Sequence, residues 1–154
     1  MNWGIKKIIS GGQSGVDNAA LDAAIKLKIP HGGCCPKGRL CETGRIPEKY
    51  NLIETDSEEY YVRTLENVKC SDGTLILSFD KKLQGGTLLT KKMAQKLKKP
   101  YLIINLNELP SNDNIFQWFS DESVNVLNIA GPRESKTPGI YNAAFNYLLN
   151  LLKD

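Results

Sequence analysis

The stretch Ile-Ile-Ser-Gly-Gly-Gln-Ser-Gly-Val-Asp, residues 8–17, says more about the fold than any other part of the chain. An apolar run stops there at paired glycines, and a helical pattern starts within a few residues. The pattern predicts a strand, a tight glycine loop and a helix N-terminus. Such a junction directs backbone N–H groups and the positive end of a helix dipole at one point, so it can bind an anion, most often a phosphate. A second junction, Gln84-Gly85-Gly86-Thr87, repeats the pattern.

Length and composition indicate the class of protein. The chain has 154 residues, 41% of them hydrophobic, which predicts one domain, residues 1–154, with a real core. The lysine-rich segment 91–99 has no aromatic residues to stack on bases, so we expect a solvated face and no nucleic-acid binding. No apolar run approaches the ~18 residues of a membrane span. The basic start, residues 1–10, does not resemble a secretory signal, and we expect a cytoplasmic protein without membrane association.

The cysteines and the single histidine are candidate metal ligands. The four cysteines, Cys34, Cys35, Cys41 and Cys70, are expected to be thiols, because disulfides rarely persist in a reducing compartment. Adjacent cysteines fit tetrahedral chelation poorly, and no Cys-x-x-Cys pair is present, so no metal site is expected. His31 most simply packs or caps a turn, and its place near the glycine loop keeps a catalytic role open.

Short apolar runs alternate with helical patterns along the chain. Runs such as residues 74–78 and 101–105 are typical of strands buried on both faces, which means a parallel sheet. The strands are placed near residues 5–10, 31–34, 52–54, 74–78, 101–105 and 124–130. The helices are placed from Val16 to about residue 27 and near residues 57–70, 87–98, 112–121 and 138–152.

This alternation predicts an α/β fold, a Rossmann-like doubly wound and mainly parallel sheet flanked by helices in three layers. We expect the strand order 3-2-1-4-5-6, in which the first and fourth strands are neighbours. The loops that follow these two strands, residues 11–15 and 79–87, then line one crevice at the carboxyl edge of the sheet. The two glycine junctions are thus expected to converge.

Motif spacing argues against two common nucleotide sites. The dinucleotide pattern Gly-x-Gly-x-x-Gly is met only as Ser10-x-Gly12-x-x-Gly15, and no acidic residue ends the second strand to bind a ribose. A Walker A loop needs Gly-Lys-Ser/Thr at the helix start, whereas this chain has Gly15-Val16-Asp17. An ordinary NAD site and ATP hydrolysis by that route are therefore not expected.

Charged residues follow several of the predicted strands. Lys37 and Arg39 lie after the second strand, and Arg133 and Lys136 lie just before the last helix. These basic side chains are candidates to bind a phosphate or an oxyanion, and the alternative is that they pair with nearby glutamates in turns. Asp17 either stabilises its helix dipole or accepts a hydrogen bond from a hydroxyl or amine of the ligand.

The helix expected at residues 57–70 has a polar stripe formed by Tyr60, Arg63, Thr64 and Asn67. Residues at this spacing share one helix face. The stripe faces a ligand or a subunit partner, or it is simply exposed to solvent, and we favour the exposed face.

Five ordered motifs, spread over nearly the whole chain, resemble the putative molybdenum carrier family. The motifs are Ser-Gly-Gly-Gln-Ser-Gly-Val-Asp-x-Ala-Ala-Leu-Asp-Ala-Ala (10–24), Pro-His-Gly-Gly-x-Cys-Pro-Lys-Gly-Arg (30–39), Ser-Asp-Gly-Thr-Leu-Ile-Leu (71–77), Gly-Gly-Thr (85–87) and Asn-x-Ala-Gly-Pro-Arg-Glu-Ser-Lys-x-Pro-Gly-Ile-Tyr (128–141).

The resemblance implies a Rossmann-like domain related to the lysine-decarboxylase-like nucleotide-binding proteins. It also implies a homo-oligomer that binds molybdenum cofactor (molybdopterin), a pterin with a phosphate and a metal oxyanion group, and that delivers it, with molybdoenzymes as acceptors. Carried over by motif, the ligand-binding residues would be Gly11, Gly12, Gln13, Ser14, Gly15, Gly85, Gly86 and Thr87, with Lys37, Arg39, Arg133 and Lys136 as anion contacts.

Two substitutions depart from the family pattern. Cys34 stands where a large aromatic residue is expected, which argues against a ring stacked on a pterin there, and Ser14 replaces a usual threonine.

The second glycine junction separates a carrier from related enzymes. Relatives that hydrolyse nucleoside monophosphates have a catalytic glutamate after Gly-Gly-x-Gly-Thr, whereas Gly85-Gly86-Thr87 is followed by residues 88–90 without a carboxylate. A carrier is therefore favoured, and no catalytic residue is assigned.

Two other functions stay open at this point. An enzyme of the nucleoside monophosphate phosphoribohydrolase type would use Asp17, Asp80 or His31 for acid–base chemistry. A nucleotide-sensing regulatory module would present the polar stripe of helix 57–70 to a partner protein.

Overall fold

A computed structural model describes residues 3–80 and 82–153. The described residues form one parallel sheet of five strands and two small sheets of two strands each. The main strands are β1 (Lys7–Ile9), β2 (His31–Gly32), β7 (Gly73–Ser78), β8 (Tyr101–Asn105) and β9 (Val126–Ala130), in the order β2-β1-β9-β7-β8. The small sheets pair β3 (Cys34–Cys35) with β6 (Ile53–Glu54) and β4 (Leu40–Cys41) with β5 (Gly44–Arg45).

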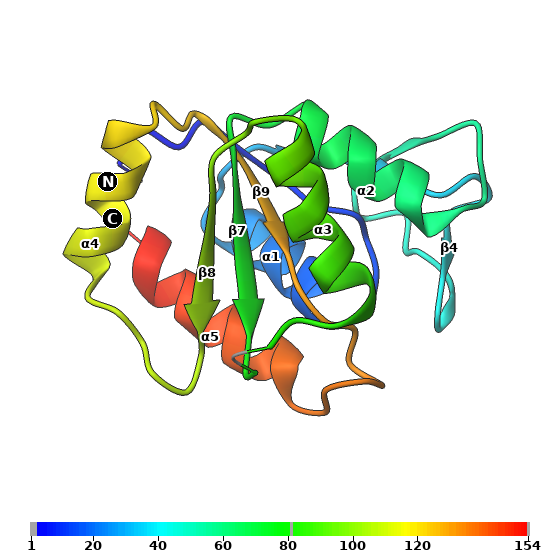
Figure 1. The fold of residues 1–154 in the computed structure, drawn as a ribbon. Helices are drawn as coiled ribbons and strands as arrows, with labels where there is room; N and C mark the ends of the chain where they lie inside the picture. The colour runs from blue at the N-terminus through cyan, green and yellow to red at the C-terminus, as the bar shows by residue number, and fades with distance from the viewer. Residues whose placement is uncertain (1–2, 81, 154) are drawn as a thin grey trace.

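Helices cover both faces of the main sheet (Figure 1). The helices are α1 (Val16–Lys26), α2 (Tyr60–Lys69), α3 (Gly85–Lys96), α4 (Asn112–Asp121) and α5 (Ile140–Leu152). Helices α1 and α5 pack together behind the sheet in Figure 1, and α2 and α3 pack together in front of it. Ile115 and Phe119 of α4 join the same apolar cluster as α1 and α5. The three-layer, Rossmann-like α/β architecture is therefore confirmed.

The two faces of the sheet differ in polarity. Leu75 and Leu77 of β7, with Leu127 of β9, lie in the apolar cluster formed with α1 and α5. Side chains alternate along a strand, so the residues between them face the α2 and α3 layer. On this face Thr74 and Ser78 of β7 and Asn128 of β9 are polar, and the Nδ2 atom of Asn128 donates to Thr74 Oγ1 at 3.2 Å. The α2 and α3 layer thus covers a surface that can bind polar groups.

Helix α1 packs closely against the sheet because its buried stripe is made of small residues. Ala19, Ala20, Ala23 and Ala24 are all completely buried in the apolar cluster. The stripe was recognised from its helical spacing, and the structure confirms it.

The expected strand order is wrong. The last strand, β9, lies between β1 and β7, so the first and fourth predicted strands are not neighbours, and the predicted strand 52–54 pairs with β3 outside the main sheet. The three middle residues of β9, Leu127, Asn128 and Ile129, are buried, as a central strand requires. If β9 and α5 are counted first, so that β9, β1, β2, β7 and β8 become strands 1 to 5, the order is 3-2-1-4-5. That is the order of a doubly wound sheet.

Element boundaries follow the sequence patterns with one break. The predicted strand 31–34 divides into β2 and β3 at Gly33, whose φ is +126° and whose Cβ position lies 2.2 Å from the carbonyl oxygen of Ser10. The predicted helix 112–121 coincides with α4, and the largest shift at another helix start is from residue 57 to residue 60. No helix among residues 3–80 and 82–153 is long and apolar enough to cross a membrane.

A glycine at the start of α1 allows the loop after β9 to approach. Gly15 has a φ of +82°, and a Cβ there would lie 2.4 Å from the carbonyl oxygen of Pro132 and 2.7 Å from the amide nitrogen of Glu134. Both neighbours are backbone atoms, so a side chain at this position would push the loop away. The junction therefore needs glycine for its conformation and also for the contact.

We predict that Gly15→Ala lowers the free energy of unfolding by about 3 kcal/mol or more, because backbone strain and a backbone clash act together. Gly139→Ala is the matched control, since Gly139 has a φ of +90° and open space where its Cβ would stand. Its expected loss is about 1 kcal/mol, from backbone strain alone. Urea denaturation measures both values, and equal losses would contradict the proposed close approach.

Candidate functional site

A cavity of about 290 Å³ opens at the carboxyl edge of the main sheet. The loops after β1, β7 and β9 line it, together with α2 and the first turns of α3. Its volume is close to the lower end of the range of small-molecule pockets. Gly11 of the first glycine junction and Gly86 of the second both line it. The predicted convergence of the two junctions is therefore confirmed, although β9 lies between their strands.

The backbone amides of the first junction are used mainly inside the protein. The amide of Gln13 donates to Asp17 Oδ2 at 3.1 Å, the amide of Ser14 donates to Gln13 Oε1 at 3.0 Å, and the amide of Val16 donates to the carbonyl of Pro132 at 3.2 Å. These groups were the predicted phosphate donors. The loop after β9 occupies the helix N-terminus that an anion would need.

The glycines of the first junction make room for protein side chains. A Cβ at Gly11 would lie 1.9 Å from Arg63 Nη1, and one at Gly12 would lie 2.7 Å from Leu52 and 2.8 Å from Ile46. Gly11 lines the cavity, whereas Gly12 faces the small apolar cluster under the hairpin formed by β4 and β5. Close packing thus accounts for both glycines.

The second junction keeps its backbone donors open. Gln84 is the N-cap of α3 and makes no side-chain capping bond, and the Cβ positions of Gly85 and Gly86 face open space. Among the residues that the structure describes, none accepts a hydrogen bond from the amides of Gly85, Gly86 or Thr87. These three residues line the cavity, so the positive end of the α3 dipole is available to an anion there.

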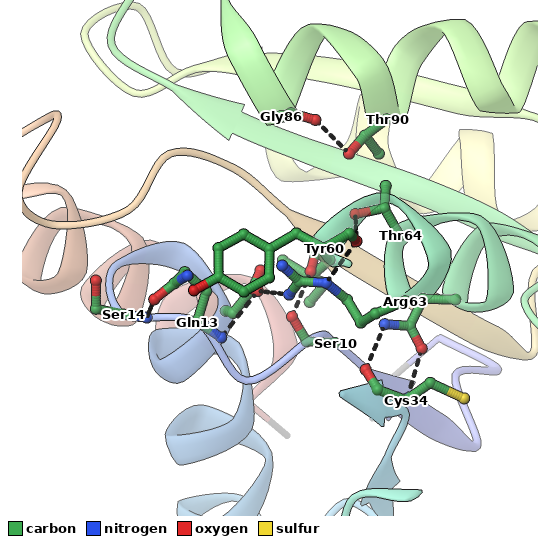
Figure 2. Close-up of polar contacts among 12 residues, drawn as sticks. Ser10, Gln13, Ser14, Cys34, Tyr60, Arg63, Thr64, Gly86 and Thr90 are labelled. Atoms are coloured by element: carbon green, nitrogen blue, oxygen red, sulfur yellow. Dashed lines mark hydrogen bonds and ion pairs between the residues drawn. The ribbon is translucent and has the colours of Figure 1, made fainter. Parts of the chain in front are cut away.

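A buried ion pair forms the inner end of the cavity. Arg63 Nη1 of α2 lies 3.0 Å from Asp17 Oδ2 of α1, and Arg63 Nε also donates to the carbonyl of Tyr60 at 3.3 Å (Figure 2). Both charged residues are more than nine-tenths buried. Burial raises the pKa of the Asp17 carboxyl, and the neighbouring guanidinium opposes that shift only in part.

The polar stripe of α2 faces the cavity, so the favoured interpretation as an exposed face is wrong. Tyr60, Arg63, Thr64 and Asn67 all line the cavity. The side chain of Asn67 also accepts from the amide of Cys34 at 2.7 Å and donates to its carbonyl at 3.0 Å, which ties α2 to β3. The stripe was visible in the sequence, but its direction depends on packing against the sheet.

Among the residues that the structure describes, three cations line the opening. Arg133 and Lys136, from the loop after β9, line the cavity as the sequence predicted, and Lys82, from the loop after β7, was missed. The guanidinium of Arg133 lies 5.8 Å from the centre of the Tyr60 ring and 3.9 Å from Glu42 Oε2. Lys82 and Lys136 are exposed. The opening is therefore positively charged.

The predicted anion contacts at Lys37 and Arg39 do not lie in the cavity. Arg39 is 6% exposed, and its guanidinium donates to the carbonyl oxygens of Ile46, Pro47 and Tyr50 at 3.2, 2.8 and 2.9 Å. The side chain holds the long loop after β3 together, because a buried guanidinium must satisfy its donors internally. Lys37 is exposed and does not line the cavity. The number of basic residues in the sequence does not show which of them line the cavity and which stabilise a loop.

Some of the other candidate acids and bases line the cavity and others lie outside it. Asp17 and Asp80 line the cavity, whereas His31 does not, and its Nε2 accepts from the amide of Asn51 at 3.1 Å. Cys34, Cys35, Cys41 and Cys70 are free thiols. Within residues 3–80 and 82–153, no three histidine, cysteine or acidic side chains are grouped to hold a metal ion.

Glu42, on the loop between β4 and β5, joins the loops beside the cavity. Its carboxylate accepts from the hydroxyls of Ser14 and Ser135, and it also accepts from the amide of Ser135 at 3.2 Å. Ser14 Oγ in turn accepts from the amide of Glu134 at 3.2 Å. Neither Ser14 nor Gly15 lines the cavity. Their role in this structure is to hold the loop after β9 in place.

Comparisons with known proteins identify the family. The model of the Circularly permutated YpsA SLOG family matches residues 8–152. The chain belongs to this family. A crystal structure of a "putative molybdenum carrier protein" from Syntrophus aciditrophicus SB has 50% sequence identity and a TM-score of 0.91, covering 97% of this chain and 95% of that chain. The resemblance seen in the sequence motifs is thereby confirmed. No curated protein matches the chain.

The family description agrees with the strand order of this YpsA SLOG chain. A circular permutation that places the first strand and helix of a doubly wound domain at its C-terminal end produces the arrangement of β9 and α5 seen here. The loop after β9, with Arg133 and Lys136, then takes the place of the first loop of an ordinary doubly wound sheet. That explains why it lies between the two glycine junctions.

We predict that Glu42→Gln destabilises the protein in a pH-dependent way. Burial acts to raise the pKa of Glu42, but the hydrogen bonds from Ser135 and Ser14 and the charge of Arg133 outweigh it and lower the pKa from its ordinary 4.5. The stabilisation is therefore full above this value and is lost as the pH falls through the folded-state pKa. At pH 7 the variant should unfold with about 1 to 2 kcal/mol less free energy, and the difference should shrink as the pH falls below 4.5 and through the lowered folded-state pKa.

Chemical denaturation at pH 7 and at a series of acid pH values measures this effect. Glu48→Gln is the control, because its carboxylate is exposed and pairs with Arg45 Nη2 at 2.6 Å and with Arg39 Nε at 3.7 Å, away from the loop after β9. A Glu42→Gln effect of the same size at pH 7 and in acid would show that the carboxylate charge does not hold the loops.

Proposed function

We propose that this protein binds a phosphate-bearing small molecule in the cavity and acts as a carrier of molybdenum cofactor, the molybdopterin complex. The observation that carries this proposal is the open N-terminus of α3, where the amides of Gly85, Gly86 and Thr87 face a cavity bordered by cations. Backbone amides at a helix start and flexible lysines both suit a phosphate. The name of the 50% identical relative supports a molybdenum-related cargo.

The donor set around the opening fits such a cargo. Lys82, Arg133 and Lys136 add positive charge beside the amides of α3, which matches a phosphate and a metal oxyanion group. Polar side chains of α2 and β9 line the inner part, which matches the nitrogen and oxygen atoms of a pterin. The metal travels as part of the cargo and needs no side-chain ligand.

A carrier fits the cavity better than a nucleotide hydrolase does. Asp17 is paired with Arg63 at 3.0 Å, and Asp80 is exposed at the opening. Thr90, three residues after Thr87, lines the cavity and donates its hydroxyl to the carbonyl of Gly86 at 3.0 Å. None of these groups is an unpaired, buried carboxylate of the kind that general acid–base catalysis uses.

The proposal also covers the domain organisation, location, oligomeric state and partners of the protein. Residues 1–154 act as one ligand-binding domain, the protein works in the cytoplasm as a homo-oligomer, and molybdoenzymes receive the cargo. Neither nucleic acid nor a membrane is a partner in this proposal.

We predict that protein purified from a host that makes molybdenum cofactor contains bound pterin, detected by fluorescence after oxidation and by native mass spectrometry. Lys136→Glu should weaken pterin binding about tenfold and so lower the bound fraction, because one charge-assisted contact to phosphate is worth about 1.4 kcal/mol. Lys37→Glu is the matched control, since Lys37 is exposed and lies outside the cavity. A wild-type protein without pterin from such a host would refute the cofactor proposal.

Light scattering after size exclusion tests the proposed oligomer. A homo-oligomer should elute at a multiple of the chain mass at micromolar concentration, and its mass should not change with the Lys136→Glu substitution. A species of one chain mass at every concentration would contradict this part of the proposal.

A further inference from the structure

The cavity is divided by depth into a neutral inner part and a charged opening. We use inner part for Gln13, Asp17, Arg63, Thr90 and Asn128, which line the cavity and are each at most 8% exposed. We use mouth for the exposed cations Lys82 and Lys136, the half-buried Arg133 and the exposed first turn of α3 at Gly85 and Gly86.

The inner part carries no net charge. Its cation and its anion are the two partners of the ion pair between Arg63 Nη1 and Asp17 Oδ2 at 3.0 Å. Any phosphate placed beside Arg63 would also lie beside the Asp17 carboxylate, and in a low-dielectric interior that repulsion is strong. The inner part is therefore a poor position for an anion.

Instead, the inner part offers neutral hydrogen-bonding groups. Gln13 Oε1 accepts from the amides of Ser14 and Glu42 at 3.0 and 2.9 Å, which fixes the side-chain amide so that Nε2 is left as a donor. One end of the Asn128 side chain is bonded to Thr74 at 3.2 Å, and the described residues bond to neither its other end nor Gln13 Nε2. Both residues line the cavity, so these two polar ends are accessible to a ligand there.

The mouth differs from the inner part in its net charge and in the kind of hydrogen-bond donors it offers. In the described part of the chain, its lining has the cations Lys82, Arg133 and Lys136 and one carboxylate, Asp80. The open amides of α3 add a fixed positive dipole at the same place. Anions are therefore favoured at the mouth and disfavoured at the inner part.

We propose that the ligand binds ring first, with a neutral nitrogen- and oxygen-rich heterocycle against the inner part and its phosphate at the mouth. This inference rests on the proposed function and adds the orientation of the cargo. Inorganic phosphate then uses only the mouth, an unphosphorylated pterin uses only the inner part, and a phosphorylated pterin uses both.

Isothermal titration calorimetry with inorganic phosphate, neopterin and neopterin monophosphate tests the orientation. Lys136→Gln should weaken binding of both phosphate-containing probes about tenfold and leave neopterin binding unchanged. Asn128→Leu should weaken binding of both pterins about tenfold and leave phosphate binding unchanged. Lys37→Gln should change none of the three affinities.

A second variant in the inner part keeps the test possible if Asn128→Leu does not fold. Thr90→Val keeps the shape of a side chain whose only described hydrogen bond is to Gly86 within α3, and it should affect the probes as Asn128→Leu does. If Asn128→Leu does not fold, Thr90→Val provides the test.

Two results would overturn the proposal in different ways. If inner variants weaken phosphate binding while Lys136→Gln weakens neopterin binding, the orientation is reversed and the carrier function stands. If phosphate binds through Lys136 but neither pterin binds, the pterin cargo itself is refuted, and with it the assignment of the inner part.

Discussion

The ion pair between Arg63 and Asp17 is the contact on which the rest of the site depends. Helix α1 lies on one face of the sheet and α2 on the other, and this pair joins them across the carboxyl edge. Taking both charges out of water is costly, so they must satisfy each other, and Gly11 leaves the space in which they meet. The pair closes the inner end of the cavity and removes its net charge. The proposed anion site is thereby restricted to the opening.

Two glycine junctions that look alike in sequence serve different purposes. At the first, the carbonyl of Pro132 accepts from the amide of Val16, and backbone atoms of the same loop fill the space beside Gly15. At the second, no described residue covers Gly85 or Gly86. The difference comes from β9, whose following loop lies over α1 and leaves α3 open. One junction therefore supports the architecture, and the other is free to meet a ligand.

Local patterns were sufficient for the elements and for much of the site. Apolar runs and helical stripes located α1 to α5 and the strands of the main sheet, because side-chain periodicity reflects which face of an element is buried. The polar loops after the strands identified Gly86, Arg133 and Lys136 as cavity residues, because parallel strands all end at the same edge. The strand order was missed, since a strand's neighbour depends on contacts distant in sequence.

Arg39 and Arg63 have roles that the sequence could not distinguish. Both are arginines in polar surroundings, yet one satisfies carbonyl groups inside a loop and the other enters the cavity. The sequence by itself determined the α/β class, the glycine turns, the family and the basic loops, because these follow from periodicity, backbone conformation and motif. Only the tertiary structure decided which amides stay open, which charges cancel and how deep each group lies. Those properties arise from pairs of groups that are brought together by folding across more than 40 residues of chain, as Asp17 and Arg63 are.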